Sequence, residues 1–422
     1  MTESAISEAA IVHLAREESG RVIALLAHRF GDLDLADESV QDALLEALEV
    51  WPIRGIPSNP PAWLYTVARN KAIDRLRRAA SAKRRLRESA HEIVAEPGEE
   101  EPDMIVENSY VGDEQLRLLL LCCHPALDRN TQVALTLRLV GGLTTTEIAA
   151  AFLTPAATLA QRIVRAKRKI RDAGIPLSIP ADLDERVDAL TVVLYLIFNE
   201  GYLSRGTGKS AIRLDLMDQA VRLTEQAVNL LPHRAELLGL LAIELFGQSR
   251  VGTRVDRDGD LILLDSQDRT RWDSHLIKEA NRVLALALTT MSPGPFQVQA
   301  MIAAHHGNAR TSDDTDWASI ATLYAQLSAM TGSPVVEVNR AVAVAMADGP
   351  GAGLAVLNAV RGLDDYYLLH ATRGELTLRS FDQDGALESF HRARNLAANP
   401  AEQRHLDRRI AEVAQIKRET PK

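Results

Sequence analysis

Apolar residues recur at helical spacing along most of this chain. In one stretch they stand at every third or fourth position: Leu159, Ile163, Ala166 and Ile170. That spacing puts all of them on one face of an α-helix. Aromatic residues make up only 4% of the sequence, while Ala and Leu abound, and these two residues lose little freedom on entering a helix. The sequence therefore predicts an all-α protein.

The composition indicates a globular protein of several domains. The chain has 422 residues, of which 46% are hydrophobic and 25% are charged, and this length suits about two to four domains. Its two cysteines, Cys122 and Cys123, are adjacent and thus unsuited to an ordinary disulfide, which favours a reducing compartment. The N-terminus lacks a signal-peptide pattern, and no apolar run is long enough to span a membrane. We expect a cytoplasmic protein with no membrane partner.

The charge is unevenly distributed. The net charge is −9, yet the segment Arg69–Arg87 holds nine Lys or Arg and one acid, and Gln161–Arg171 holds six Lys or Arg and no acid. Between them, Glu88–Asp103 holds seven acids and no Lys or Arg. Two short basic zones in an acidic protein indicate localised phosphate contacts. The alternative is two solvated helix faces.

Residues 8–87 are expected to form three helices. The second has an apolar stripe: Val40, Ala43, Leu44, Ala47 and Trp51. Asp37 is a candidate for its N-terminal cap. Four prolines are expected in the following loop, because each removes a helical hydrogen bond: Pro52, Pro57, Pro60 and Pro61. Either of the last two can begin the third helix. Apolar periodicity then fades, and residues 88–112 are predicted to be an acidic linker.

Residues 113–175 are expected to contain a helix-turn-helix. One helix is predicted over Asn130–Val140, with a glycine pair ending it. Thr144 or Thr145 can cap the next helix, and Thr154–Pro155 can begin the last one. Two short helices joined by a tight turn, the second basic on its outer face, are typical of a DNA-binding motif.

The remaining chain, residues 183–418, is predicted to be a large helical extension. Its one clear break contains Asp258-Gly259 and is expected to be a hairpin or turn. Near its end, small and aromatic residues keep the spacing of a tetratricopeptide helix pair: Gly374, Ala386, Phe390 and Ala393. We favour a solenoid here only slightly over a generic helical bundle.

The third helix carries candidate DNA-contacting residues. Asn70, Asp74 and Arg77 share one face, and Trp63 lies on nearly the same stripe. Exposed bases stack on aromatic rings, amides read base edges, and cations hold phosphates, so the set suits an opened DNA strand. Alternatively, Trp63 is a core anchor and the charged residues form weak surface pairs.

At these residues the chain resembles a known family. The segments Asp37–Leu44 and Trp63–Arg78 resemble region 2 of extracytoplasmic-function (ECF) sigma factors of the sigma-70 family. Leu143–Ala149 and Thr158–Ile170 resemble their region 4, in the expected order. The resemblance covers roughly residues 8–175. The extension is similar to that of a subgroup with a C-terminal tetratricopeptide-like domain, which is thought to replace a separate anti-sigma protein.

The resemblance implies partners and roles for particular residues. It implies binding to the β′ clamp and β flap of core RNA polymerase and to promoter DNA. One face of the second helix is then expected to dock on the clamp: Glu38, Gln41, Asp42 and Leu45. The third helix is expected to recognise and melt the −10 element: Trp63, Arg69, Asn70, Asp74, Arg77 and Arg78. The last helix of the helix-turn-helix is expected to read the −35 element: Thr158, Gln161, Arg162, Arg165 and Arg168. The turn Phe152–Thr158 is one residue longer than usual in the family, so this register is open by one position.

Other patterns do not complete a chemical site. Gly206–Ser210 lacks the first glycine of a phosphate-binding loop, and consecutive Cys122, Cys123 and His124 cannot surround one zinc ion. We expect no enzyme activity, no cofactor and no metal.

Three questions stay open: the function class, the role of the extension and the role of one segment. The chain could be a helix-turn-helix regulator with a repeat-type sensor that never touches polymerase, or an interaction scaffold. The extension is expected to receive an unidentified signal-carrying protein or ligand, and it could inhibit or be required. In Tyr195–Tyr202 the apolar part is expected in the core, while Asn199, Glu200 and Tyr202 lie there too or face a partner or ligand groove.

Overall fold

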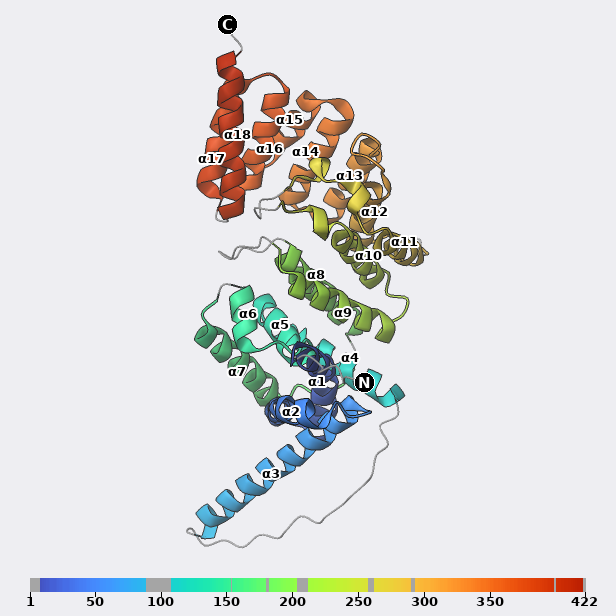
Figure 1. The fold of residues 1–422 in the computed structure, drawn as a ribbon, viewed down its shortest axis with the longest axis vertical. Coiled ribbons are helices and arrows are strands. Elements are labelled where there is room, and N and C mark those ends of the chain that lie inside the picture. Colours follow the sequence, from blue (N-terminus) through green and yellow to red (C-terminus); the bar gives the residue numbers. More distant parts are fainter. Residues whose placement is uncertain are drawn as a thin grey trace. The chain divides into compact units, whose positions relative to one another are not determined.

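The computed structural model describes residues 8–88, 108–152, 154–179, 182–202, 212–256, 262–289, 293–397 and 400–419. Its regular elements over these ranges are helices, which confirms the all-α class (Figure 1). The chain divides into two compact units, Met1–Val193 and Leu194–Lys422. Within the ranges described, none of the helices combines the length and apolar character that a membrane span requires.

Unit one begins with a three-helix bundle of α1 (Glu8–Phe30), α2 (Leu33–Arg54) and α3 (Pro60–Glu88). The predicted stripe of α2 lies in its core, with Val40, Ala43 and Ala47 fully buried and Trp51 nearly so. Leu64 and Ala68 of α3 pack into the same interior. Burial of such a stripe stabilises a helix far more than its intrinsic propensity does.

Two details of α2 correct the sequence prediction. Asp37 is not the cap, because the helix begins at Leu33 and Asp32 Oδ1 accepts from the backbone N–H of Asp34 at 2.9 Å and of Leu35 at 3.0 Å. Pro52 lies inside the helix instead of the loop. A proline so close to a helix end removes only one hydrogen bond, and the following turn still closes from Gly55 N–H to the Trp51 carbonyl. Pro60 does begin α3, as expected.

The second half of unit one holds α4 (Asn108–Cys122), α5 (Arg129–Leu135), the π-helical η1 (Thr136–Val140), α6 (Thr145–Ala151) and α7 (Ala156–Asp172). Thr144 caps α6 in a reciprocal pair with Glu147, so that prediction is confirmed. By contrast, α7 begins one residue later than predicted, with Pro155 in the cap position. α4 begins inside the stretch predicted as linker, and the linker's residues 89–107 lie outside the described residues.

The single helix predicted over Asn130–Val140 is instead an α-helix that widens into a π-turn. This widened turn packs against α1 at Gly20, where a Cβ atom would stand 2.6 Å from the Val140 carbonyl oxygen. Glycine is thus needed for the two backbones to approach this closely. The contact fixes the first bundle against the helix-turn-helix.

Unit two stacks its helices largely in chain order, and most of them pack mainly on a neighbour in sequence (Figure 1). The helices are α8 (Leu183–Tyr202, which starts in unit one), α9 (Leu214–Leu230), α10 (Ala235–Ser249), α11 (Ser274–Ala287), α12 (Pro295–Asn308), α13 (Trp317–Thr331), α14 (Pro334–Asp348), α15 (Pro350–Ala359), α16 (Tyr367–Arg379), α17 (Gln383–Leu396) and α18 (Pro400–Glu419). Such sequential stacking is the packing order of a solenoid. In the α16–α17 pair, a Cβ on Gly374 would meet the Phe390 ring at 2.8 Å, so the predicted small-to-aromatic contact is present.

The break in the extension lies between α10 and α11. It contains three short 3₁₀ turns: η2 (Val251–Thr253), η3 (Leu264–Ser266) and η4 (Arg269–Arg271). The Ile262 N–H donates to the Arg254 carbonyl at 2.8 Å and closes a loop there. The predicted Asp258-Gly259 turn itself lies outside the described residues.

Candidate polymerase and nucleic-acid interfaces

The outer face of α2 is acidic with one apolar residue at its centre. Leu45 is 61% exposed, and Glu38 is exposed as well, while Gln41 and Asp42 are half-buried. Arg75 of α3 pairs with Glu38 and donates to Asp42 Oδ2 at 2.8 Å. The hydrogen bond to Asp42 raises the pKa of Arg75. The two carboxylates are therefore held in place beside an exposed leucine.

α3 presents the residues predicted to contact the −10 element. Trp63 packs edge-on against Trp51, with ring centroids 5.4 Å apart, and stays half-buried. Asn70, Asp74 and Arg77 are all exposed, as the shared helix face requires. The list of predicted residues is completed by half-buried Arg69 and exposed Arg78. Trp63 thus combines an anchor in the bundle with a partly exposed ring, so the two readings of this residue are compatible.

α7 turns its predicted readers outward. Its buried face holds Leu159, Ile163, Ala166 and Ile170, while Thr158, Gln161, Arg165 and Arg168 are exposed and Arg162 is half-buried. Arg162 and Arg165 line a groove of about 430 Å³ between α7 and the start of α5. Asp128 lies in the same groove, where a hydrogen bond from Thr131 lowers its pKa and the charge of Arg162 adds to that effect.

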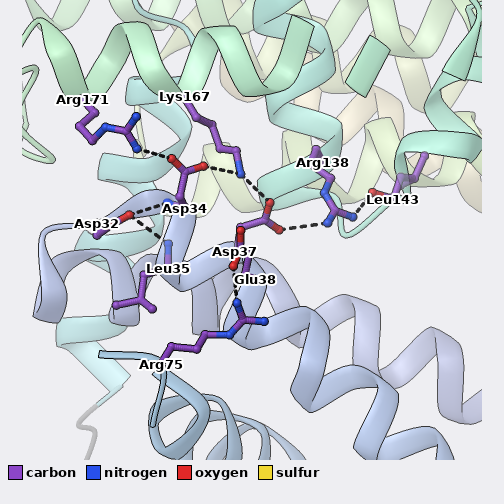
Figure 2. A network of polar contacts seen from close by, with 10 residues as sticks. All are labelled: Asp32, Asp34, Leu35, Asp37, Glu38, Arg75, Arg138, Leu143, Lys167 and Arg171. Atoms are coloured by element: carbon purple, nitrogen blue, oxygen red, sulfur yellow. Dashed lines mark hydrogen bonds and ion pairs between the residues drawn. The ribbon is translucent and has the colours of Figure 1, made fainter. Parts of the chain in front are cut away.

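An ionic network, buried at Lys167 and Asp37, joins α2 to the helix-turn-helix (Figure 2). Lys167 Nζ of α7 lies 3.1 Å from Asp37 Oδ2 and 2.8 Å from Asp34 Oδ1. Arg138 of η1 reaches Asp37 Oδ1 at 3.2 Å, and Arg171 donates to Asp34 Oδ2 at 2.7 Å. Three cations from one half of the unit therefore meet two carboxylates from the other.

The charges of this network support one another. Burial disfavours the ammonium form of Lys167, but Asp37 and Asp34 outweigh that effect and raise its pKa. Lys167 is consequently a cation even though only 7% of its side chain is exposed. Since a buried charge is costly without a partner, the two halves of the unit depend on each other at this point.

Sequence reasoning missed this network, although a signal was present. Lys167 stands four residues after Ile163 and therefore on the buried face of α7, where a cation requires an acidic partner. The sequence pattern instead favours Asp37 as a helix cap. The predicted polymerase and DNA residues lie on other faces, so the structure gathers them into three separate surfaces.

Comparisons with known proteins match both halves of unit one. The sigma-70 region 2 family matches residues 14–82, and the sigma-70 region 4 family matches residues 117–170. A family of unknown function, DUF6596, matches residues 186–288. No solved structure matches the chain.

Two relatives extend these matches. A protein of Rhizobium meliloti (strain 1021), named only as uncharacterized, is 38% identical over 431 residues. The alignment covers 99% of this chain and 99% of that protein. ECF RNA polymerase sigma factor SigK of Mycobacterium ulcerans (strain Agy99) is 28% identical over 157 residues, which are 36% of this chain and 79% of that protein.

Two sigma domains in one chain define a transcription initiation factor with DNA-binding domains. The chain belongs to the sigma-70 family, as a distant homologue of ECF sigma factors that carries a DUF6596 extension. Membership in this family, which is not a family of enzymes, implies core RNA polymerase and promoter DNA as partners.

Proposed function

We propose that this sigma factor docks on the polymerase clamp through the outer face of α2, melts the −10 element with α3 and reads the −35 element with α7. The observation that carries the proposal is the exposure of these three surfaces on one chain. The α2 face is acidic around exposed Leu45, whereas α3 and α7 are cationic outside. Acidic and basic surfaces kept apart suit a protein that binds a protein partner with one and DNA with the others.

The decisive experiment is run-off transcription with core RNA polymerase and a pool of genomic promoter fragments. Wild-type protein is expected to give discrete transcripts, and Asp42→Arg is expected to abolish them. Glu388→Arg makes the same charge change at an exposed position of α17 and serves as the control. Transcripts that persist with Asp42→Arg would remove the α2 face from the proposal.

A charge swap separates docking from internal stability. Asp42→Arg also breaks the contact with Arg75 inside the bundle. Adding Arg75→Asp restores an ion pair of opposite polarity but leaves the reversed charge on the outer face. If transcription stays lost in the double variant, Asp42 acts in docking. If transcription returns, the internal pair was the important contact.

The helix-turn-helix regulator is the alternative function, and the same assay distinguishes it. That protein binds promoter DNA without supporting polymerase-dependent initiation. We favour the sigma factor because the region 2 match covers α2 and α3, which such a regulator does not need.

We further propose that the extension tunes this activity. Truncation tests whether the extension raises or lowers transcription. The cut must spare the first half of α8, because Val187 and Leu190 are buried and Arg186 donates to the Leu120 carbonyl within unit one. A chain ending after Val193 that is more active than the full chain identifies an inhibitory extension. A folded but inactive chain identifies a required one, and circular dichroism checks the folding.

A further inference from the structure

Unit two contains a cavity that the sigma activity does not use. Its volume is about 500 Å³, within the usual range for small-molecule sites. We call it the aromatic cavity after its walls: Tyr195, Phe198, Tyr202, Phe246, Trp272 and Tyr324. Three of these six rings come from the segment Tyr195–Tyr202, whose role the sequence left open.

The segment divides between core and cavity. Ile197 and Phe198 are buried, at 0% and 2% exposure, as the apolar pattern predicts. Tyr195 and Tyr202 are half-buried, and so is Asn199, which lines the cavity and has no hydrogen-bond partner among the described residues. Part of the face of each half-buried ring is not packed against the core, so a ligand in the cavity can stack on it.

The cavity also has a cationic side. Arg250 lines it, with its guanidinium carbon 5.3 Å from the centre of the Tyr202 ring. Arg254 is only 8% exposed, its guanidinium carbon lies 3.3 Å from the centre of the same ring, and it donates to the Tyr202 carbonyl. Arg269 lies 5.0 Å from the Trp272 ring. In the part of the chain that the structure describes, none of these three arginines has a carboxylate within ion-pairing distance.

The polar side chains that line the cavity in the described chain supply no negative charge. Burial, together with Arg250 and Arg269, lowers the pKa of His306 to about 3, so this cavity residue is neutral. Its Nδ1 atom is buried and accepts or donates no hydrogen bond within the described chain. Of the described residues that line the cavity, none is acidic. A guanidinium held at an apolar hollow without a counterion is a site for an anion.

We propose that the aromatic cavity binds a small aromatic carboxylate, with its ring against the aromatic wall and its carboxylate on Arg250. One lining guanidinium matches one negative charge and takes a carboxylate in a two-pronged hydrogen bond. A phosphate monoester brings a charge of about −1.5 to −2 and fits this single cation less well. The proposal goes beyond the sigma activity and does not depend on it.

One helix that lines the cavity begins in unit one. The second half of α8 lines the cavity, and the first half of the same continuous helix is buried in unit one. A ligand that orders Tyr195, Asn199 and Tyr202 therefore acts on a helix that region 4 also contacts through Arg129, which donates to the Ala189 carbonyl at 2.9 Å.

Calorimetry on the full chain, without polymerase or DNA, tests the proposal. The probes are 1-naphthylacetate, its neutral amide and 1-naphthyl phosphate. The carboxylate is expected to bind at least about tenfold more tightly than the amide, a difference of about 1.4 kcal/mol, and more tightly than the phosphate. Equal affinity for acid and amide, tighter binding of the phosphate, or no binding of the carboxylate each overturns the proposal.

Two variants assign the preference to its residue. Arg250→Gln is expected to remove the preference for the acid while leaving the weak binding of the amide. Lys278→Gln removes an exposed cation of α11 and is expected to change neither affinity. If both variants weaken the acid equally, the effect is one of overall charge and the assignment to Arg250 is wrong. Because the comparison of acid with amide uses the wild-type chain, it remains decisive even if Arg250→Gln misfolds.

Discussion

Lys167 Nζ of α7 lies 3.1 Å from Asp37 Oδ2 of α2, and the two residues are 130 positions apart in the chain. Only 7% and 6% of their side chains are exposed. This ion pair connects the region 2 bundle to the helix that carries the predicted −35 readers. Ion pairs therefore contribute, together with apolar packing, to the orientation of α7 relative to α2 in this structure (Figure 2).

Breaking this pair is expected to destabilise unit one. Lys167→Met leaves the buried carboxylate of Asp37 and the half-buried one of Asp34 with fewer cations, and removing one partner of a buried pair costs about 3 kcal/mol or more. Urea unfolding of the full chain, followed by tryptophan fluorescence, measures the change. Arg168→Met is the matched control, because its exposed pair with Asp172 is worth at most about 0.5 kcal/mol. Equal losses in the two variants would contradict the importance of the buried pair.

The same pair predicts a pH dependence at the alkaline end. The pKa of Lys167 is raised in the folded state above its ordinary value of 10.5. Its contribution is therefore complete below pH 10.5 and is lost as the pH rises through the folded-state pKa. The difference in unfolding free energy between wild type and Lys167→Met is expected to be constant from pH 7 to about 10 and to shrink above that. A difference that stays constant up to pH 12 would show that another group carries it.

A buried carboxyl in the extension is expected to weaken the fold at neutral pH. Glu244 is fully buried, accepts from Thr224 Oγ1 at 3.1 Å and leaves its Oε2 atom without a partner among the described residues. Burial raises its pKa well above 4.5, so stability is lost as the pH rises from 4.5 towards the folded-state value.

Replacing that carboxyl by an amide removes the cost. Glu244→Gln is expected to stabilise the chain by about 1–3 kcal/mol at pH 7 and to have less effect near pH 4. Thermal unfolding at both pH values measures the difference. Exposed Glu388→Gln should change neither midpoint. A destabilised Glu244→Gln variant would mean that the carboxylate serves a partner.

The outward face of α7 yields a prediction for DNA binding. Arg165 is exposed and lines the groove beside α5. If it contacts a phosphate, Arg165→Ala weakens promoter binding by the polymerase complex equally on all sequences and lowers the salt slope by about 1. If it reads a base, the variant costs about 1–3 kcal/mol and relaxes one position of the −35 element. Lys278→Ala is the control, and an Arg165→Ala variant that behaves like it would remove Arg165 from the reading face.

Gly20 is expected to be irreplaceable at the contact of α1 with the π-turn. Gly20→Ala places a Cβ 2.6 Å from the Val140 carbonyl oxygen and 2.9 Å from its Cα, so the backbones must separate, at about 1–3 kcal/mol. Gly351→Ala, which meets nothing within 4 Å in helix α15, should instead stabilise by up to about 1 kcal/mol. Chemical denaturation of both variants tests the contrast. A stable Gly20→Ala chain would mean that the η1 backbone moves away from the added Cβ at little cost in unfolding free energy.

Features that depend on neighbours along the chain are predictable from the sequence alone. The apolar stripe of α7 and the cap of α6 by Thr144 and Glu147 follow from helical periodicity and from hydrogen bonds that span three residues. The exposure of the predicted readers follows from the same periodicity. The family resemblance rested on such local patterns, which is why the order of the two sigma regions was predictable.

Features that join distant segments are visible in the fold and not in the local sequence pattern. The local pattern favours Asp37 as the cap of α2, whereas in the fold Asp32 is the cap and Asp37 pairs with Arg138 and Lys167 in the interior. The π-turn forms where α1 packs against it, and the aromatic cavity exists only because α8, α10, α12, α13 and α14 surround one hollow. Helical periodicity assigns a residue to a face, but the charge or space that the face meets comes from elements far away in the chain.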